Sequence, residues 1–517
     1  MDTSRLIPSA LVGGALSAVF YSWYRSRNSV SLPPGPKGNF ILGSVLDVRN
    51  NAFWLKFAEY TDQYGPIITV RMLHNYLFII DDPRLVTEIF EKRAANYSDR
   101  SVNGMAQLIG WEDVIVFLPY GPLLKRYRTM LQRALNNRAS LDYIPLQLHE
   151  VQRFMRRLVD QPDRFMEHVH LMASSIAVRI AYGYKVDSTD DRFVQVAEEL
   201  MAAFSDVAAP ATWAVSVLPI LRYLPEWFPF VAFHRRARYL RELDKHSRND
   251  PFDYVVKQMA EGTAEDSFTS KLLQPEDNQP LDDETKENIK SIAATLYGAG
   301  SDTTVSAVQS FFLAMTLYPD VQAKAQAEIA VYMRQKSTRD GQSRMILPVD
   351  RPNLPYTSAL VRELLRWHPI LNIVAHRSSN QDDCNVVWEG KVYRIPAYCV
   401  VGANVWKIMH NPDVYPEPDR FKPERYLVEN PPPEPESYAF GFGRRACPGV
   451  HIAQQSMWIS VSNTLANFMI TKAKDEHGVE ITPEERYSNG LISHPLPFKC
   501  CITPREGCEE WLRELVE

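Results

Sequence analysis

The chain has 517 residues, of which 45% are hydrophobic and 23% are charged, as in an ordinary globular protein. Its net charge of -5 shows no basic excess, which argues against nucleic acid as a partner. The six cysteines form no CxxC pair and have no regular spacing, which argues against a disulfide scaffold and a structural zinc site.

The amino-terminal residues 6–24 contain no charged side chain. A helix of this length spans about 28 Å, enough for one crossing of a bilayer. The run ends in an aromatic pair at 23–24 and is followed by Arg25 and Arg27, which favours a cytosolic location for the rest of the chain. The sequence therefore predicts a single-pass anchor. A cleaved signal peptide is the competing interpretation, although only Arg5 precedes the apolar run.

Residues 25–40 form a proline-rich connector, with the run PPGP at 33–36. Proline fixes φ and supplies no backbone N–H, so this segment is expected to be stiff. No second linker and no internal repeat follows. We therefore expect residues 41–517 to form a single domain.

Helical periodicity dominates this domain. The clearest helical runs are residues 85–93, 148–158, 288–318, 321–334 and 356–367. Alternation typical of strands is confined to residues 67–72, 76–80 and 392–395. The predicted fold class is mainly α with a small β part.

The sharpest motif is FGFGRRACPG at residues 440–449, followed by a helical run at 451–468. A cysteine just before a helix lies near free N–H groups and the positive end of the helix dipole, which favour a thiolate. Gly443 and Gly449 let the backbone approach a flat macrocycle, and Arg445 is suited to a propionate carboxylate. The alternative is a buried structural cysteine. The pattern favours Cys447 as an axial ligand of haem iron.

This loop matches every fixed position of Phe-x-x-Gly-x-Arg-x-Cys-x-Gly, from Phe440 to Gly449, and the sequence resembles the cytochrome P450 family. The resemblance implies a cytochrome P450-like haem domain with a thiolate ligand that favours O–O cleavage. It also implies electrons from NADPH delivered by a flavin-containing partner reductase, and a location on the endoplasmic reticulum membrane with the catalytic domain in the cytosol.

A second motif places Glu363 and Arg366 three residues apart on one helical face. An isolated pair of this kind is usually a solvated surface contact. The resemblance implies that Arg425 completes a buried network supporting the haem pocket. Tyr426 stands where the family more often has Phe.

A third motif, AGSDTT at residues 299–304, lies inside the long apolar run at 289–317. These residues lower helix propensity, and a hydrogen bond from Thr303 to the carbonyl of Ala299 would open the helix. The resemblance implies an oxygen groove in which Asp302 and Thr303 deliver protons. The alternative is a helix kink with a satisfied hydroxyl.

Further haem contacts are implied by position. Arg128, and Arg377 after the helix that carries Glu363, are expected near the propionates. Leu124 stands where the family usually has Trp, so one hydrogen bond to the haem is in doubt.

A basic segment spans residues 125–138, in a stretch without acidic residues between Asp113 and Asp142. Its cations are Lys125, Arg126, Arg128, Arg133 and Arg138. Such a face is suited to an acidic electron donor, with a solvated helix face as the alternative. The resemblance favours a membrane-bound NADPH reductase as that donor.

The substrate is expected to be a hydrophobic small molecule. Residues 207–232 are rich in Trp, Leu, Ile and Phe, which indicates contact with lipid or an apolar access route, or ordinary core. By family analogy the candidate pocket residues are Ile292, Leu296, Ala299, Ile373, Val374 and Leu491.

The sequence thus predicts a membrane-anchored monooxygenase, closest in style to fungal enzymes that make terpenoid or polyketide secondary metabolites. A xenobiotic or lipid hydroxylase is an alternative. A haem-thiolate isomerase or dehydratase, and a non-catalytic binding protein, are disfavoured by Asp302 and Thr303, because neither needs proton delivery to dioxygen.

Overall fold

The computed structural model describes residues 30–49, 52–73, 75–228, 231–274, 280–340 and 344–515. The predicted anchor at residues 6–24 lies outside these residues, as does the start of the connector. Within the described ranges, none of the helices combines the length and the apolar character needed to cross a membrane.

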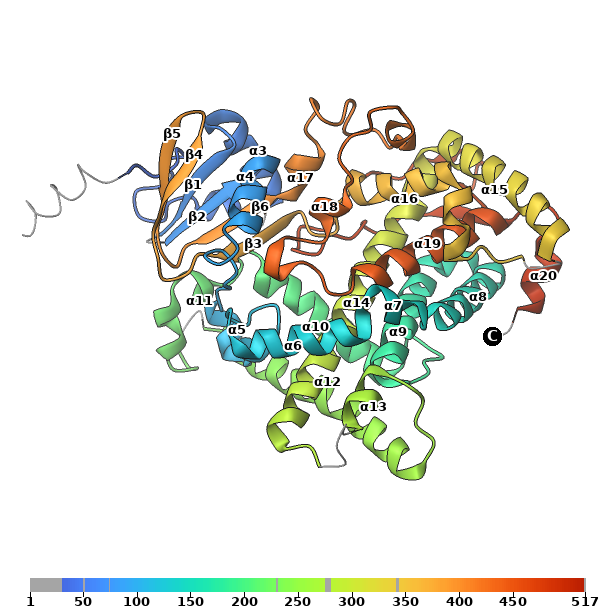
Figure 1. Ribbon diagram of the computed structural model, residues 1–517, viewed down its shortest axis with the longest axis horizontal. Coiled ribbons are helices and arrows are strands. Elements are labelled where there is room, and N and C mark those ends of the chain that lie inside the picture. The colour runs from blue at the N-terminus through green and yellow to red at the C-terminus, as the bar shows by residue number, and fades with distance from the viewer. Residues whose placement is uncertain are drawn as a thin grey trace, which may run out of the picture.

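Helices make up most of the fold (Figure 1). The α-helices are α2 (Val45–Val48), α3 (Phe53–Tyr64), α4 (Pro83–Val86), α5 (Gly104–Ile109), α6 (Pro122–Leu135), α7 (Asn137–Leu141), α8 (Ile144–Asp160), α9 (Phe165–Tyr182), α10 (Arg192–Ala208), α11 (Ala214–Val217), α12 (Phe233–Glu261), α13 (Phe268–Leu273), α14 (Asp283–Leu317), α15 (Pro319–Asp340), α16 (Pro355–Trp367), α17 (Val405–Met409), α18 (Glu436–Ala439), α19 (Val450–Asn467) and α20 (Glu509–Glu514). The π-helical and 3-10 turns are η2 (Thr87–Lys92), η3 (Trp111–Asp113), η4 (Pro162–Arg164), η5 (Pro219–Tyr223), η6 (Pro348–Asn353), η7 (Pro423–Tyr426) and η8 (Gly443–Arg445).

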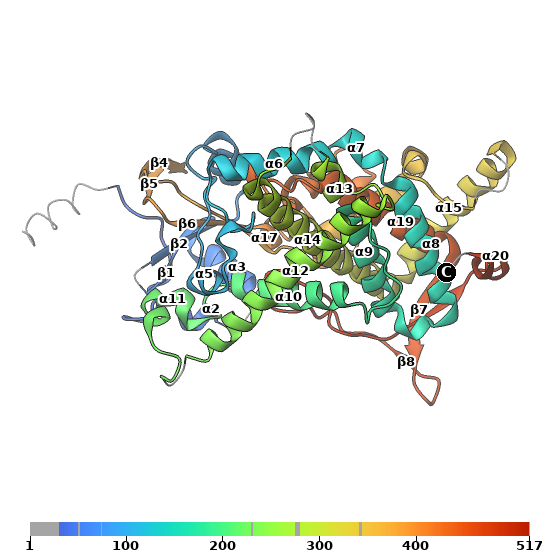
Figure 2. The ribbon, with the colours of Figure 1, turned by 90° about the horizontal axis from the view of Figure 1, so that it is seen from below.

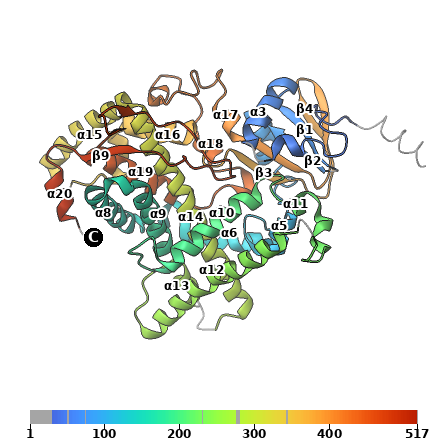
Figure 3. The same cartoon turned by 180° about the vertical axis from the view of Figure 1, so that it is seen from behind.

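The β part is small and divided into three sheets. Its strands are β1 (Ile67–Met72), β2 (Asn75–Ile80), β3 (Ile373–Arg377), β4 (Asp383–Trp388), β5 (Lys391–Ile395), β6 (Val400–Asn404), β7 (Phe468–Lys474), β8 (Glu480–Ile481) and β9 (Cys500–Pro504). The largest sheet has the order β1-β2-β6-β3, with β2 and β6 parallel and the outer pairs antiparallel. This sheet lies at one end of the molecule, and α15 and α20 lie at the other (Figures 1 and 3).

The mainly α prediction with a small β part is confirmed, and the strongest predicted elements lie close to their expected positions. The runs at 148–158, 288–318, 321–334 and 356–367 correspond to α8, α14, α15 and α16, and the strand run at 67–72 is β1. The run at 85–93 is α4 followed by the π-helical turn η2. The Asp82 side chain accepts from the backbone N–H groups of Arg84 and Leu85, which starts α4 at Pro83.

The proline-rich connector packs against the domain where the structure describes it. The backbone N–H and the side chain of Thr69 on β1 donate to the carbonyls of Pro34 and Pro33, both at 2.8 Å. A Cβ atom at Gly35 would lie 2.0 Å from the Thr69 carbonyl oxygen, so only glycine allows this approach. This part of the connector is therefore docked along the sheet.

The long helix α14 passes through the centre of the fold. Figures 1 and 3 show α16 and α19 on one side of it and α12 and α13 on the other, and Figure 2 shows α9 and α10 beside it. Phe311, Phe312 and Leu313 on α14 are fully buried. Burying large apolar side chains stabilises the fold by about 1.5–3 kcal/mol each, so α14 is a rigid base for the residues near its middle.

Candidate active site

The loop that carries Cys447 is fixed by its backbone. The Cys447 N–H donates to the Phe440 carbonyl at 2.7 Å, and the Gly443 N–H donates to the Glu91 carboxylate at 2.7 Å. Gly443 has a φ of 52°, and a Cβ atom there would lie 2.3 Å from the carbonyl oxygen of Phe90. Glycine is required at 443 because the loop passes directly over η2.

Cys447 lies just before α19, with Gly449 as the N-cap residue. Burial raises the pKa of the Cys447 thiol, while the backbone N–H of Gly449 and the charge of Arg128 act to lower it. The helix terminus alone thus does not outweigh desolvation, contrary to the simple expectation from its position. A coordinated metal cation deprotonates a thiol outright, so a thiolate at this position would need such a cation.

A cluster of cations lies beside this loop, made of Arg100, Arg128 and Arg445. The Arg128 guanidinium donates to the Ala446 carbonyl at 3.0 Å, and Arg445 donates to the Ser98 carbonyl at 2.8 Å. Burial and the charge of Arg100 lower the pKa of Arg445 to about 9, and burial lowers the pKa of Arg100 to about 10. Desolvated cations held close to one another favour an anionic partner.

Two buried nitrogen atoms near the cluster have no hydrogen-bond partner within the described chain, Nε of Arg100 and Nε2 of His376. The His376 Nδ1 atom donates to the Tyr97 carbonyl at 2.7 Å, and burial lowers the pKa of His376 to about 3. Unsatisfied buried polar atoms are rare and point to a missing partner. The Arg100 Nε–H is a free donor and therefore fits a carboxylate of a haem, whereas Nε2 of the neutral His376 is an acceptor and needs a donor such as water.

Arg377 was expected near the haem propionates, but its side chain contacts an acidic and an aromatic residue. Its guanidinium is 3.5 Å from the Asp99 carboxylate and lies over the Tyr398 ring at 4.8 Å. The sequence analysis missed His376 and Arg100, which carry the unsatisfied atoms. The histidine directly precedes Arg377 and could have been found from that position, but no sequence signal marks Arg100.

Leu124 on α6 is fully buried in an apolar cluster with Leu118 and Tyr127. Its side chain has no hydrogen-bond donor, so α6 contributes Arg128 to this region and no second polar group.

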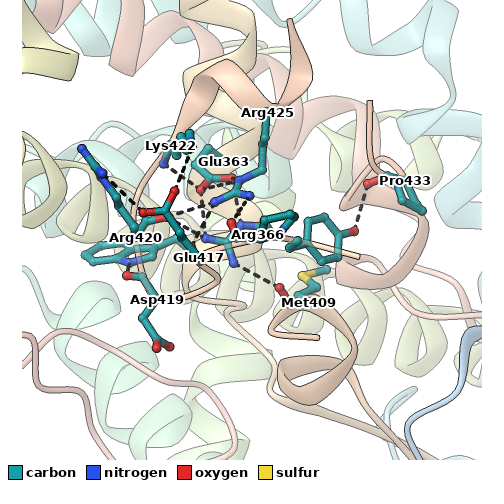
Figure 4. Close-up of polar contacts among 12 residues, drawn as sticks. Glu363, Arg366, Met409, Glu417, Asp419, Arg420, Lys422, Arg425 and Pro433 are labelled. Atoms are coloured by element: carbon teal, nitrogen blue, oxygen red, sulfur yellow. Dashed lines mark hydrogen bonds and ion pairs between the residues drawn. The ribbon is translucent and has the colours of Figure 1, made fainter. Parts of the chain in front are cut away.

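The Glu363, Arg366 and Arg425 side chains form a buried network (Figure 4). The Glu363 and Arg366 side chains are 0% exposed and paired at 2.8 Å, and Arg425 is 3.1 Å from the same carboxylate. Arg366 also donates to the Met409 carbonyl at 3.0 Å, and Arg425 to the Pro416 carbonyl at 2.9 Å. The network joins α16 to the segment before the Cys447 loop.

Tyr426 lies next to this network. Its hydroxyl is buried without a hydrogen-bond partner in the described chain, and burial raises its pKa. The Phe that is more common at this position would avoid that unsatisfied group.

A cavity of about 930 Å³ adjoins the cation cluster. The volume lies near the upper end of the range for small-molecule pockets. Four predicted pocket residues line it: Ala299, Ile373, Val374 and Leu491. Arg100, His376 and Thr303 also line it, so the cavity joins the cation cluster to the middle of α14.

Ile292 and Leu296, which were also expected in the pocket, do not line it. Ile292 is fully buried in an apolar cluster, and Leu296 packs against two such clusters. Beside the predicted Ala299, α14 lines the cavity with Ser291, Ala294, Thr295 and Gly298. Ser291 and Thr295 each precede an expected residue by one position, which turns a helical side chain by about 100°.

Thr303 forms the predicted hydrogen bond, donating from Oγ1 to the Ala299 carbonyl at 2.8 Å. The helix nevertheless continues through Gly300 without a break in α-helical structure. Asp302 does not line the larger cavity, and its carboxylate is 3.3 Å from Nε2 of His494. The two residues expected to act together thus face different spaces.

The far end of the larger cavity is polar. Arg248 on α12 is paired with Asp244 at 2.7 Å and with Asp113 in η3 at 2.5 Å. The Trp111 indole donates to Asp244 at 3.0 Å. These contacts join α12 to the segment before α6.

A sequence model of the family Cytochrome P450 matches residues 33–502. The chain belongs to the cytochrome P450 family. It is 37% identical over 502 residues to Cytochrome P450 monooxygenase claR of Ampulloclitocybe clavipes, a match that covers 96% of this chain and 90% of the relative. It is 36% identical to Cytochrome P450 monooxygenase ppsD of Aspergillus oryzae, covering 92% of this chain and 89% of the relative.

Among solved structures, a zebrafish cytochrome P450 crystallised with abiraterone is similar with a TM-score of 0.67. The sequences are 20% identical, and the match covers 88% of this chain and 100% of the other. This likeness shows the cytochrome P450 fold. The chain is therefore a monooxygenase of the oxidoreductase class that uses a thiolate-ligated haem. Members of the family generally receive electrons from NADPH through a flavin-containing reductase.

Proposed function

We propose that this cytochrome P450 oxidises a hydrophobic small molecule in secondary metabolism, for example a terpenoid or a polyketide. The observation that carries the proposal is the cavity of about 930 Å³, which extends from Arg100 and His376 to Thr303 and combines apolar walls with a polar end at Asp244 and Arg248. Buried pockets of this kind suit apolar ligands oriented by a few polar groups. The fungal relatives named above support the setting.

Residues from separate parts of the chain would hold the haem. Cys447 would supply the thiolate ligand, Phe440, Gly443 and Gly449 would shape its loop, and Arg445, Arg128 and Arg100 would neutralise the propionates, with Arg377 as an outer cation. The bound haem supplies the activation of dioxygen. The protein supplies the shape of the loop, the charge balance and the exclusion of water.

Proton delivery is assigned to Asp302 and Thr303 on α14. The Thr303 hydroxyl faces the larger cavity and is oriented by its bond to the Ala299 carbonyl. The Asp302 carboxylate lies 3.3 Å from Nε2 of His494 and would exchange protons with the neighbouring space. A general acid positioned in this way contributes roughly 10²–10⁴-fold to a rate.

We further propose a single-pass location in the endoplasmic reticulum membrane, with residues 6–24 as the anchor. Support comes from the apolar side chains after α11, where Ile220 is 71% and Trp227 81% exposed, and from Phe40 in the connector, which is 92% exposed. Figures 1 and 2 place α11 at the sheet end of the molecule. Exposed aromatic and aliphatic groups of this kind suit a lipid interface.

The reductase is proposed to dock on the basic segment of α6 and α7. Lys125, Arg126, Arg133 and Arg138 are exposed there, whereas Arg128 turns inward to the Cys447 loop. The four exposed cations can thus contact a partner, while Arg128 contacts the Cys447 loop. An exposed basic face of this kind suits an acidic electron donor.

The test is incorporation of oxygen from ¹⁸O₂. The full chain is reconstituted with an NADPH-dependent flavoprotein reductase in phospholipid vesicles and incubated with a panel of terpenoids and polyketides. We expect a product that carries one ¹⁸O atom and requires NADPH, with the Cys447→Ala variant as the inactive control. Products whose new oxygen comes from water, or that form without NADPH, would contradict the proposal.

A further inference from the structure

The polar end of the larger cavity is formed by α12 and the first part of α14. Asp244 and Arg248 line the cavity from α12, which lies beside α14 (Figure 2). Ser291 lines it from α14, and its hydroxyl donates to the Asp113 carbonyl at 3.5 Å. Because Asp113 is paired with Arg248, these residues lie together at one end of the cavity.

This end is distant from Thr303. Ser291 and Thr303 are both on α14 and both line the cavity, and the twelve positions between them correspond to about 18 Å along the helix. A ligand that reaches from the polar end to Thr303 is therefore elongated.

The Asp244 carboxylate can accept a further hydrogen bond. Nε of Arg248 lies 2.7 Å from one of its oxygens, and the Trp111 indole donates to the other at 3.0 Å. A carboxylate has about four acceptor sites, so these contacts leave acceptor capacity toward the cavity. Burial raises the pKa of the Asp244 carboxyl, although Arg248 and Trp111 act to lower it. These two partners thus do not fully replace water around the carboxylate.

The charge at this end is negative. The Arg248 guanidinium directs Nε toward Asp244 and both terminal nitrogens toward Asp113, so two carboxylates surround one cation and leave one negative charge. A ligand carboxylate would be a third anion in this partly buried place, which is unfavourable. A hydroxyl group brings a donor and no charge, and it therefore fits.

We propose that Asp244 determines the substrate specificity of the larger cavity, because its carboxylate accepts a hydrogen bond from a hydroxyl group on an elongated apolar substrate. The inference rests on the proposed oxidation of a hydrophobic small molecule and names the class of that substrate. Apolar alcohols bind with the hydroxyl at Asp244 and the chain directed toward Thr303, whereas the corresponding carboxylic acids are rejected.

The experiment measures the binding of three probes to the haem-loaded full chain by isothermal titration calorimetry. The probes are farnesol, farnesyl methyl ether and farnesoic acid, of which the ether keeps the apolar chain and the oxygen but has no donor. We expect farnesol to bind about tenfold more tightly than the ether, because a hydrogen bond to a charged group favours the alcohol. Burial of apolar surface alone would favour the ether. The ionised acid should bind most weakly.

Asp244→Asn keeps the shape of the side chain and removes its charge. The amide oxygen is needed by Nε of Arg248, and the amide nitrogen is a donor, so we expect the preference for farnesol over the ether to fall to about twofold or less. Asp250→Asn is the matched control, because Asp250 is on the same helix and pairs with His246 away from the cavity lining. It should keep the native preference.

A second variant tests the position of the hydroxyl group without changing the ion pair. Ala294 lines the cavity about one helical turn after Ser291, and Ala294→Leu would fill part of this end. We expect farnesol to bind severalfold more weakly, and the ether to be affected less because it is not held at Asp244. This variant decides the question if Asp244→Asn does not fold.

The proposal is overturned if the native protein binds farnesol no more tightly than the ether, or if folded Asp244→Asn keeps the native preference. It is also overturned if Ala294→Leu weakens both probes equally. Failure of the proposed function looks different, since no apolar compound in the ¹⁸O₂ panel would then be oxidised. Oxidation of apolar compounds in that panel, together with equal binding of farnesol and its ether, would overturn this inference alone.

Discussion

The cofactor side and the substrate side of this molecule are built by different means. On the cofactor side, the Glu363 and Arg366 side chains are fully buried, and backbone carbonyls satisfy their network. On the substrate side, the segment after α11 leaves Ile220 and Trp227 largely exposed. Short motifs determine the first region, whereas the second depends on the shape of surfaces that face a ligand or a membrane.

The largest expected effect concerns the buried network. Arg366→Ala leaves the Glu363 carboxylate buried beside Arg425 alone, which costs about 3–5 kcal/mol in free energy of unfolding. Denaturant unfolding followed by circular dichroism measures this loss. Glu417→Gln, at an exposed neighbouring position, is the control and should change stability by less than about 1 kcal/mol. Equal stability of the native and Arg366→Ala proteins would contradict the account.

A second prediction compares two arginines at the haem pocket. Arg100→Leu removes a buried cation with an unsatisfied nitrogen, and we expect haem retention to weaken about tenfold to hundredfold. Arg377→Leu should weaken it less than about threefold, because Arg377 is paired with Asp99. The rate of haem transfer to an acceptor protein measures haem retention in both variants. A larger loss of haem in Arg377→Leu than in Arg100→Leu would contradict this prediction.

A third prediction lies at the boundary between the two sides. Thr303→Ala removes the hydroxyl from the larger cavity but leaves α14 helical, so the protein should bind haem normally. We expect the yield of hydrogen peroxide per NADPH to rise about tenfold in the presence of an apolar ligand. Thr304→Ala is the matched control, since its hydroxyl donates to the Gly300 carbonyl and does not line the cavity. The same peroxide yield in both variants would refute the role of Thr303.

The smallest expected effect is at Tyr426. Replacement by Phe removes a buried hydroxyl without a partner and should raise the free energy of unfolding by about 1 kcal/mol. A loss of stability on thermal unfolding would show that this hydroxyl has a partner after all.

The sequence predicted the cofactor side well because its constraints are local. The spacing of Glu363 and Arg366 places both on one helical turn, and Gly443 is required by a close backbone approach. The helical periodicity of the α14 segment was equally clear in the sequence. The sequence did not show which face of α14 lines the larger cavity. It therefore predicted Ile292 and Leu296 as pocket residues, and it predicted that Asp302 faces the same space as Thr303.

Tertiary contacts decide the remaining features. Arg100 gains its role only because the segment before α5 folds onto the Cys447 loop, and His494 meets Asp302 from a part of the chain far away in sequence. No periodicity or local motif encodes such contacts, and a single sequence therefore predicts the buried network and the Cys447 loop better than the pocket beside them.

The central claim, that Cys447 is the thiolate ligand of a haem, is tested most directly by the carbon monoxide difference spectrum of the reduced protein. We predict the strongly red-shifted Soret band of a thiolate-ligated haem in the native chain, and its loss in Cys447→Ala but not in Cys501→Ala, where the cysteine is exposed on β9. A folded native protein that binds haem without this band, or a Cys447→Ala variant that keeps it, would contradict the assignment.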